Sequence, residues 1–176
     1  RKKERMFNMS EKTIQGGAFL IEDLTGEDVI TPEDFTEEHK MIAKTTEDFV
    51  QGEVIPLVDN LENHEFEHSV KLLKKAGDLG LLSADIPEEY GGLGLDKISS
   101  SLITENFAPA GGFSITHGAH VGIGSLPIVF FGNHEQKSQY LPKLATGESI
   151  AAYALTEPGA GSDALGAKTT ARLNEA

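Results

Sequence analysis

Apolar side chains recur at helical spacing in the first half of the chain. Phe35, Ile42 and Phe49 follow one another at intervals of seven residues and make one apolar stripe. Such a stripe is typical of a helix that packs against a helical core. Pro56 interrupts the pattern and predicts a kink or a restart, because proline cannot donate the backbone hydrogen bond that a helix needs. A second amphipathic helix is predicted over 68–79.

Capping residues mark two further helices. Asp96 precedes an apolar stretch that runs to about Phe107, and a carboxylate at that position accepts a hydrogen bond from the first helical turn. Asn133, followed three residues later by Gln136, has the pattern of a capping box. Together these stretches predict a mainly α fold with an α-helical bundle domain over 35–148.

An uncharged stretch over 113–131 separates these two helices. It has about the length of a membrane span, but it contains His117, His120 and Pro127. We interpret it as the buried central helix of the bundle. The two histidines stand one helical turn apart and could ligate a metal, but without a third ligand they would make a weak site. We interpret them as core or pocket-lining residues.

The pattern changes from helical to alternating near the C-terminal end of the sequence. The stretches 150–155 and 168–173 have the composition of strands and predict the opening of a β domain over 149–176. Two strands alone are marginally stable, so we expect the sequence to be truncated at its C-terminus. Between them, small residues after Pro158 would let backbone amides approach a bound group closely. The run 153–166 therefore predicts a ligand-binding loop.

Polar side chains in this loop favour binding over catalysis. Thr156 and Ser162 offer hydroxyls that could help backbone amides hold a phosphate or the polar edge of a planar ring. Glu157 and Asp163 could act as catalytic carboxylates, but carboxylates in a turn more often fix the turn itself. Ser162 lacks the Gly-x-Ser-x-Gly context of an activated nucleophile, and no histidine follows it.

A second glycine-rich loop lies at 86–95. Gly91, Gly92 and Gly94 could form a phosphate-binding loop, yet no Lys-Ser/Thr pair follows them and no strand is expected before them. We favour a loop that its apolar side chains anchor to the bundle.

Charge and composition narrow the range of partners. Asp and Glu number 28 against 15 Lys and Arg, and the net charge of −13 argues against nucleic acid or an anionic membrane as a partner. The absence of cysteine excludes a disulfide framework and a thiolate metal site and is compatible with a cytoplasmic location. No signal-peptide pattern follows the basic start. We expect residues 1–34 to be an extended, poorly ordered acidic arm.

Three blocks of sequence resemble the acyl-CoA dehydrogenase family. The block Tyr153–Asp163 (Tyr-Ala-Leu-Thr-Glu-Pro-Gly-Ala-Gly-Ser-Asp) looks like the family's flavin signature, and blocks 136–148 and 86–95 stand in the family's order and approximate spacing. The resemblance covers roughly 35–176 and is nearest to the very-long-chain type. It implies a helical N-terminal domain, a middle β domain and a C-terminal four-helix domain, of which this chain holds the first and the opening of the second.

The resemblance implies a flavoprotein oxidoreductase of fatty acid β-oxidation. Family members bind FAD, convert an acyl-CoA substrate to the trans-2-enoyl-CoA and pass electrons to an electron-transfer flavoprotein. The residues implied to contact FAD are Tyr153, Leu155, Thr156, Gly161 and Ser162, and Ser162 would also meet the CoA part of the substrate. Residues 116–120 would lie near the acyl chain. The family's catalytic glutamate belongs to its C-terminal domain, so the base is expected beyond residue 176 and no catalytic residue is assigned within this chain.

This placement predicts that the chain by itself is inactive and holds FAD weakly or not at all, and that the full-length protein is a homo-oligomer.

Two other interpretations stay open. An acyl-CoA oxidase or a flavin-dependent monooxygenase has the same architecture but differs in how the reduced flavin meets oxygen. A non-enzymatic helical module would instead use the acidic arm to bind a partner.

Overall fold

The computed structural model describes residues 17, 20–21, 23 and 30–172, and the chain divides into two units, Arg1–Thr36 and Glu37–Ala176. In the first unit, Thr31 caps a 3-10 turn over Pro32–Asp34. The amide and the Oγ1 of Thr31 both donate to Asp34 Oδ2, at 3.1 and 3.2 Å. Most of the acidic arm predicted over 1–34 lies outside the described residues.

The second unit begins with a helix that is interrupted near Pro56, as predicted. Helix α1 (Glu37–Phe49) continues through a π-turn (Val50–Val54) and a 3-10 turn (Ile55–Leu57) into α2 (Val58–Glu62). Pro56 occupies the 3-10 turn, where its missing N–H breaks the regular helical hydrogen-bond pattern. The first helical stretch therefore bends at the position that the sequence indicates.

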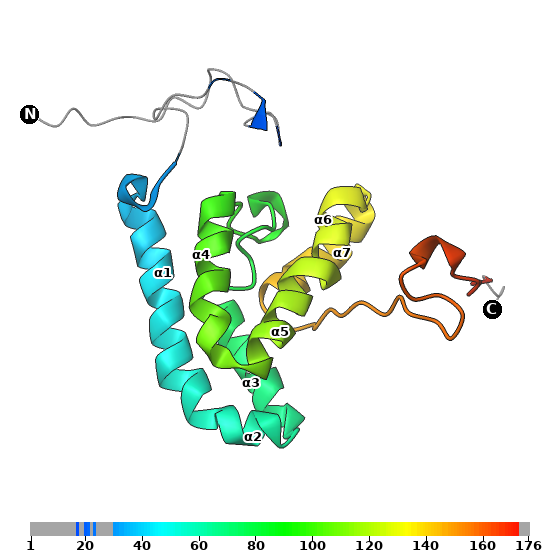
Figure 1. Cartoon of the computed structure of the whole chain (residues 1–176), viewed down its shortest axis with the longest axis horizontal. Helices are drawn as coiled ribbons and strands as arrows, with labels where there is room; N and C mark the ends of the chain where they lie inside the picture. Colours follow the sequence, from blue (N-terminus) through cyan, green and yellow to red (C-terminus); the bar gives the residue numbers. More distant parts are fainter. Residues whose placement is uncertain (1–16, 18–19, 22, 24–29, 173–176) are drawn as a thin grey trace, which may run out of the picture. The chain divides into compact units, whose positions relative to one another are not determined.

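Further helices complete the bundle. They are α3 (Phe66–Asp78), α4 (Lys97–Phe107), α5 (Gly112–Ala119), α6 (Leu126–Phe131) and α7 (His134–Ala145). Helix α1 lies beside α4, α5 contacts α2, α3 and α4, and α6 packs on α7 (Figure 1). The mainly α fold class predicted from the sequence is confirmed.

Two apolar clusters form the core of this unit. In the larger cluster Phe107 is 1% exposed, and its ring centroid lies 6.0 Å from that of Phe49 and 6.2 Å from that of Phe113. Burial of one such side chain stabilises a fold by roughly 1.5–3 kcal/mol. The smaller cluster consists of Ile86, Tyr90, Leu141, Leu144 and Ala145, and it attaches the 86–95 loop to α7.

Both predicted helix caps are confirmed. Asp96 Oδ1 accepts the amide hydrogen of Ser99 at 2.8 Å, and its Oδ2 lies 2.8 Å from His39 Nε2. Burial disfavours the charged carboxylate, but these hydrogen bonds outweigh it, so the pKa of Asp96 lies below its ordinary value. At α7, Asn133 and Gln136 exchange side chain to backbone hydrogen bonds of 2.8 and 2.9 Å.

The uncharged stretch forms two helices and is only partly buried. A π-turn over His120–Gly124 separates α5 from α6. By length and composition the run Gly112–Phe131 could cross a membrane, and 22% of that window is buried in the fold. Ile115, Ile123 and Phe131 are 74%, 55% and 87% exposed. The prediction of a buried central helix is therefore wrong for most of this run, because the described bundle covers one side of it.

The chain after α7 is irregular. The strands predicted over 150–155 and 168–173 form no ladder within the described part of the chain, where a single bridge pairs Glu157 with Ala160. An extended segment becomes a strand only when a neighbouring strand satisfies its backbone groups. Within the described range, neither segment has such a neighbour.

Candidate functional site

The predicted ligand loop is closed by hydrogen bonds of its own. The backbones of Glu157 and Ala160 exchange two N–H···O bonds of 2.9 and 3.1 Å. The Glu157 carboxylate accepts the amide hydrogens of Lys168 at 2.8 Å and Thr169 at 2.9 Å. These bonds, with that from Lys168 the strongest, lower the pKa of Glu157. The geometry favours the turn-shaping role of Glu157 over a catalytic one.

Asp163 also serves the backbone of the loop. Its carbonyl accepts the amide hydrogen of Gly166 at 3.0 Å, at the start of a 3-10 turn over Ala164–Gly166. A Cβ placed on Gly166 would lie 2.5 Å from Asp163 Oδ2, so the turn is packed against this carboxylate. Asp163 therefore has surroundings that suit a turn residue.

The residues predicted to contact a flavin lie on the surface of this segment. Tyr153 and Leu155 are 54% and 40% exposed, and Thr156, Gly161 and Ser162 are exposed as well. Within the described chain, the backbone amides of 152–156 donate no hydrogen bond. A Cβ on Gly161 would meet nothing within 4 Å. The five residues share one open segment whose amides and hydroxyls are available to a bound group, but the described chain does not enclose them.

A contact with the π-turn holds the start of this segment to the bundle. The amide of Ala151 donates to His120 Nδ1 at 3.1 Å. A Cβ on Gly124 would lie 2.7 Å from Ala151 Cβ, so glycine is required where the two backbones approach. The sequence predicts a core or pocket position for His120 but not this tether, because no local pattern links positions 31 residues apart.

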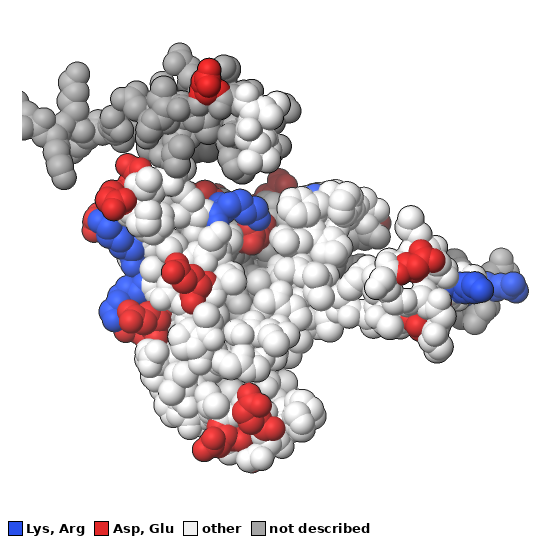
Figure 2. Space-filling view, in the orientation of Figure 1, with Lys and Arg blue, Asp and Glu red and all other residues white. Residues whose placement is uncertain are grey.

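An apolar surface lies next to this contact. Ile115 on α5, Ile123 in the π-turn and Phe131 on α6 are exposed, and Figure 2 shows a largely uncharged surface over this region. A Cβ on Gly118 or Gly122 would meet nothing within 4 Å. Exposed apolar side chains on an uncharged surface are typical of a place where another chain segment or an apolar ligand packs. The apolar pattern of 113–131 predicts burial, so this exposed surface does not follow from the sequence.

The two histidines of this run are core residues. His117 is 2% exposed, its ring stacks on Phe107 with centroids 3.8 Å apart, and its Nε2 lies 3.0 Å from Leu81 O. Burial is the main cause that lowers the pKa of His117 to about 4. His120 is 0% exposed, and its Nε2 lies 2.9 Å from Leu144 O. Both rings donate to carbonyl oxygens, which confirms the core interpretation over metal ligation.

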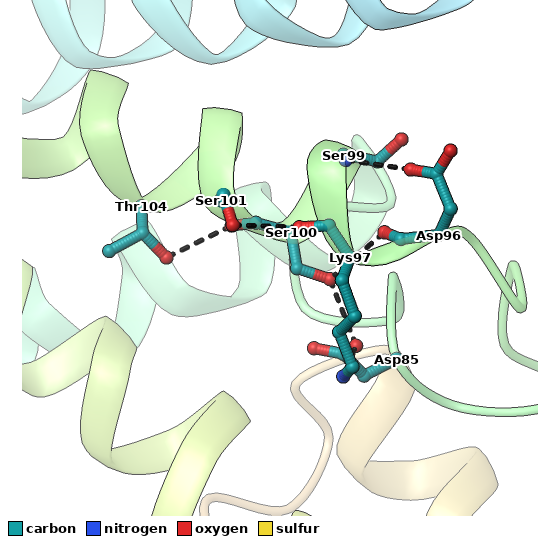
Figure 3. Close-up of polar contacts among 7 residues, drawn as sticks. All are labelled: Asp85, Asp96, Lys97, Ser99, Ser100, Ser101 and Thr104. Atoms are coloured by element: carbon teal, nitrogen blue, oxygen red, sulfur yellow. Dashed lines mark hydrogen bonds and ion pairs between the residues drawn. The ribbon is translucent and has the colours of Figure 1, made fainter. Parts of the chain in front are cut away.

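A small, mainly apolar cavity lies between the 81–86 loop, α4 and α5. Asp85 accepts hydrogen bonds from Lys97 and from Ser100 Oγ, the latter at 2.9 Å, and these contacts fix the start of α4 to the preceding loop (Figure 3). The cavity beside them is lined in part by Asp85, Thr104 and His117 and has a volume of about 40 Å³. Such a volume admits water but no substrate. This cluster is therefore structural.

The 86–95 loop is also structural. Tyr90 is buried, and its hydroxyl lies 3.1 Å from His134 Nδ1 on α7. A Cβ on Gly92 would lie 1.9 Å from Ile86 O, so this glycine permits a close backbone contact. The anchoring interpretation is supported, and the phosphate-binding alternative is not.

Comparison with known proteins gives consistent matches. Residues 36–148 match the family described as acyl-CoA dehydrogenase, N-terminal domain. The chain is 75% identical over 162 residues to a probable acyl-CoA dehydrogenase of Bacillus subtilis (strain 168), a match that covers 92% of this chain and 27% of that protein.

Two solved structures extend the comparison. The crystal structure of an acyl-CoA dehydrogenase complexed with FAD from Bacillus anthracis superposes with a TM-score of 0.88 at 72% identity, over 92% of this chain and 28% of that one. A chain from a structure titled for the electron transferring flavoprotein of Acidaminococcus fermentans gives 0.73 at 37% identity, over 80% of this chain and 37% of that one. The chain thus spans between about a quarter and two fifths of the length of these relatives.

Proposed function

The chain belongs to the acyl-CoA dehydrogenase family, and on this basis we propose that it supplies the N-terminal helical domain and one wall of the flavin site to an FAD-dependent enzyme. The proposed reaction is the α,β-dehydrogenation of a fatty acyl-CoA thioester to the trans-2-enoyl-CoA. When bound, FAD would accept the hydrogen that leaves the β carbon as hydride. The chain's own residues would bind and orient the reactants.

The open segment 152–162 is the observation that carries this proposal. Its first five amides donate no hydrogen bond within the described chain, and Tyr153 and Leu155 expose apolar side chains between them. A flavin ring has apolar faces and a polar edge, so it fits a segment that offers both. The amides of Leu155 and Thr156 would donate to the pyrimidine edge, where donors stabilise the negative charge of the reduced ring. The Ser162 hydroxyl would lie where the cofactor and the CoA part of the substrate meet.

The exposed side of α5 and its π-turn is the proposed surface for the acyl chain. Gly118 is exposed and Thr116 is half-buried on this side, while His117 and His120 are buried on the other. An acyl chain gains roughly 0.8 kcal/mol for each CH₂ that it removes from water, so an uncharged surface is what it needs. This divides the stretch 116–120 into substrate-facing and core-facing residues.

The base for this reaction is not among the carboxylates of the loop. The Glu157 carboxylate is held by two backbone amides, which lower its pKa and weaken it as a base. We propose that a glutamate outside this sequence removes the α-proton, and that the chain by itself turns over no acyl-CoA and holds FAD weakly or not at all. An electron-transfer flavoprotein as electron acceptor and a homo-oligomeric full-length enzyme complete the proposal on the family resemblance.

Flavin binding and turnover test this proposal. The full-length enzyme should retain flavin absorbance after desalting and reduce a dye with a long-chain acyl-CoA, and the chain alone should do neither. Ser162→Ala in the full-length enzyme should raise KM for acyl-CoA and weaken FAD binding, each by about tenfold, as expected for the loss of one hydrogen bond. Ser101→Ala is the matched control, because among the described residues the partner of Ser101 Oγ is the carbonyl of Lys97 on the same helix.

Three outcomes would contradict the proposal. Turnover by the chain alone would show that the base lies within it. If Ser162→Ala changed neither KM nor FAD affinity, Ser162 would not be a binding residue of the site. Rapid peroxide formation, after anaerobic reduction by acyl-CoA and exposure to oxygen, would favour the acyl-CoA oxidase alternative.

A further inference from the structure

Both ring nitrogens of His120 are engaged. Nε2 lies 2.9 Å from the carbonyl oxygen of Leu144, and Nδ1 lies 3.1 Å from the amide nitrogen of Ala151. A carbonyl oxygen can only accept a hydrogen bond and a backbone amide can only donate one. Nε2 therefore carries the ring hydrogen and Nδ1 carries the lone pair. The two neighbours select a single neutral tautomer.

The surroundings of His120 keep the ring in place. The residue is 0% exposed, and burial lowers its pKa, which favours the neutral form. It begins the π-turn His120–Gly124, and the hydroxyl of Ser125 donates to its carbonyl at 2.6 Å. Such π-turns occur mostly as single turns within helices, frequently at functional sites. The ring is therefore held in one orientation, with Nε2 as the hydrogen-bond donor and Nδ1 as the acceptor.

The two hydrogen-bond partners of the ring, Leu144 and Ala151, lie before and after the turn that follows α7. Leu144 is in the last turn of α7, and Ala151 stands two residues before Tyr153. Beyond Ala151, the next amide of the described chain that donates a backbone hydrogen bond is that of Glu157, whose partner Ala160 belongs to the loop itself. Ala151 is thus the last amide contact between the bundle and the flavin-binding residues within the described range.

We propose that His120 is a positioning residue for the flavin site. Its ring would hold Ala151 to the π-turn and thereby set where Tyr153, Leu155 and Thr156 meet the cofactor, while the bond to Leu144 O keeps Nδ1 as the acceptor. His120 touches no reacting group and acts only through Ala151. The proposal rests on the proposed function, because that function assigns the flavin to this segment.

Two substitutions separate the two hydrogen bonds. In His120→Asn the side-chain oxygen can take the place of Nδ1 and accept from Ala151, but the side chain is too short to reach Leu144 O. In His120→Gln the side-chain nitrogen can take the place of Nε2 and donate to Leu144 O, but no acceptor remains for Ala151. Each variant loses one hydrogen bond and part of the ring packing, so a purely structural role predicts similar effects for both.

A positioning role predicts different effects on the full-length enzyme. His120→Gln should weaken FAD binding by about tenfold and shift the flavin absorbance maximum, whereas His120→Asn should stay within about threefold of the unsubstituted enzyme. His117→Gln is the control: it alters a buried histidine of the same run that donates to Leu81 O, away from the loop, and FAD affinity should not change. Equal losses in the Asn and Gln variants, or an equal loss in the control, would overturn the proposal.

Nuclear magnetic resonance of the chain gives a readout that needs no flavin. The ¹⁵N shifts of the His120 ring should identify the Nε2–H tautomer, and the Ala151 amide should be protected from exchange in the unsubstituted chain and in His120→Asn, but not in His120→Gln. The Nδ1–H tautomer, or an unprotected Ala151 amide, would overturn the proposal even if every variant misfolded. If these signals are as expected but no form of the full-length enzyme binds FAD, the hydrogen bond between His120 and Ala151 is confirmed and the proposed function is contradicted.

Discussion

The helical bundle and the segment that follows it satisfy their polar groups in different ways. In the bundle, buried groups such as His39, His117 and His120 have partners from other helices, turns or loops, and no buried side-chain nitrogen or oxygen of the described residues lacks one. In the segment, the amides of 152–156 have no partner within the described chain. The bundle therefore satisfies its polar groups internally, whereas the segment leaves these amides to solvent or to the bound group that we propose.

The largest expected effect tests the stability of the bundle. Phe107→Ala removes a ring that contacts Phe49 and Phe113 and on which His117 stacks, so the free energy of unfolding should fall by about 3–5 kcal/mol. Urea unfolding of the chain, followed by circular dichroism, measures the loss. Phe131→Ala is the control, because this ring is 87% exposed, and it should change stability by less than about 0.5 kcal/mol. A comparable loss in the control would mean that the outer side of α6 is covered.

Acid should destabilise the bundle through His117. The pKa of this residue is about 4 in the fold, below its ordinary 6.5, because burial disfavours the charged ring. The unfolded chain therefore binds a proton first as pH falls. The contribution of neutral His117 to the free energy of unfolding is therefore complete above pH 6.5, and it declines by about 3 kcal/mol as the pH falls toward 4. Asp96 acts in a different window: its pKa is lowered, so its contribution is lost only as pH falls below about its ordinary 3.8.

Urea unfolding at several pH values separates these contributions. His117→Gln should be less stable than the unsubstituted chain at pH 7 and should show a smaller decline between pH 6.5 and 4. If the variant declines as steeply as the unsubstituted chain, His117 is not the group that makes the bundle sensitive to acid.

Removal of a cap should have a smaller effect. Asp96→Ala deletes the acceptor for the Ser99 amide and the partner of His39, and it should lower the free energy of unfolding by about 1–2 kcal/mol. Asp96→Asn keeps a capping oxygen and should lose less. Glu105→Ala, on the exposed side of the same helix, should stay within about 0.5 kcal/mol. Thermal unfolding ranks the three variants by stability. Equal losses for Asp96→Ala and Asp96→Asn would show that the loss of the cap is not the cause.

Features that depend on neighbouring residues were predictable from the sequence. The caps Asp96 and Asn133 each bond to a residue three positions on, and the break at Pro56 follows from one missing N–H. Local chemistry decides these cases, so a single sequence carries the signal. The helical class follows in the same way, because it depends on the spacing of apolar residues within each helix.

Features that depend on distant partners were not predictable. The tether from Ala151 to His120 joins residues with no local relation, and only the fold brings them together. The exposure of Ile115 and Ile123 depends on what packs against their side of the helix, which an apolar pattern does not specify. The two expected strands fail for the same reason, since a ladder requires a second strand.

The smallest effect on stability gives the sharpest test of the difference between the two regions. Glu157→Gln leaves one side-chain oxygen where the carboxylate now accepts from Lys168 and Thr169, so at least one of these amides should lose its protection against hydrogen exchange. The free energy of unfolding of the bundle should change by less than about 0.5 kcal/mol, because the described partners of this carboxylate lie in the segment itself. Exchange followed by nuclear magnetic resonance, with urea unfolding on the same sample, measures both. A loss of 1 kcal/mol or more in the bundle, which exceeds the roughly 0.5 kcal/mol of an uncoupled surface change, would show that the loop and the helices unfold as one unit. Stability would then not separate the two regions, and the open amides of 152–156 alone would distinguish them.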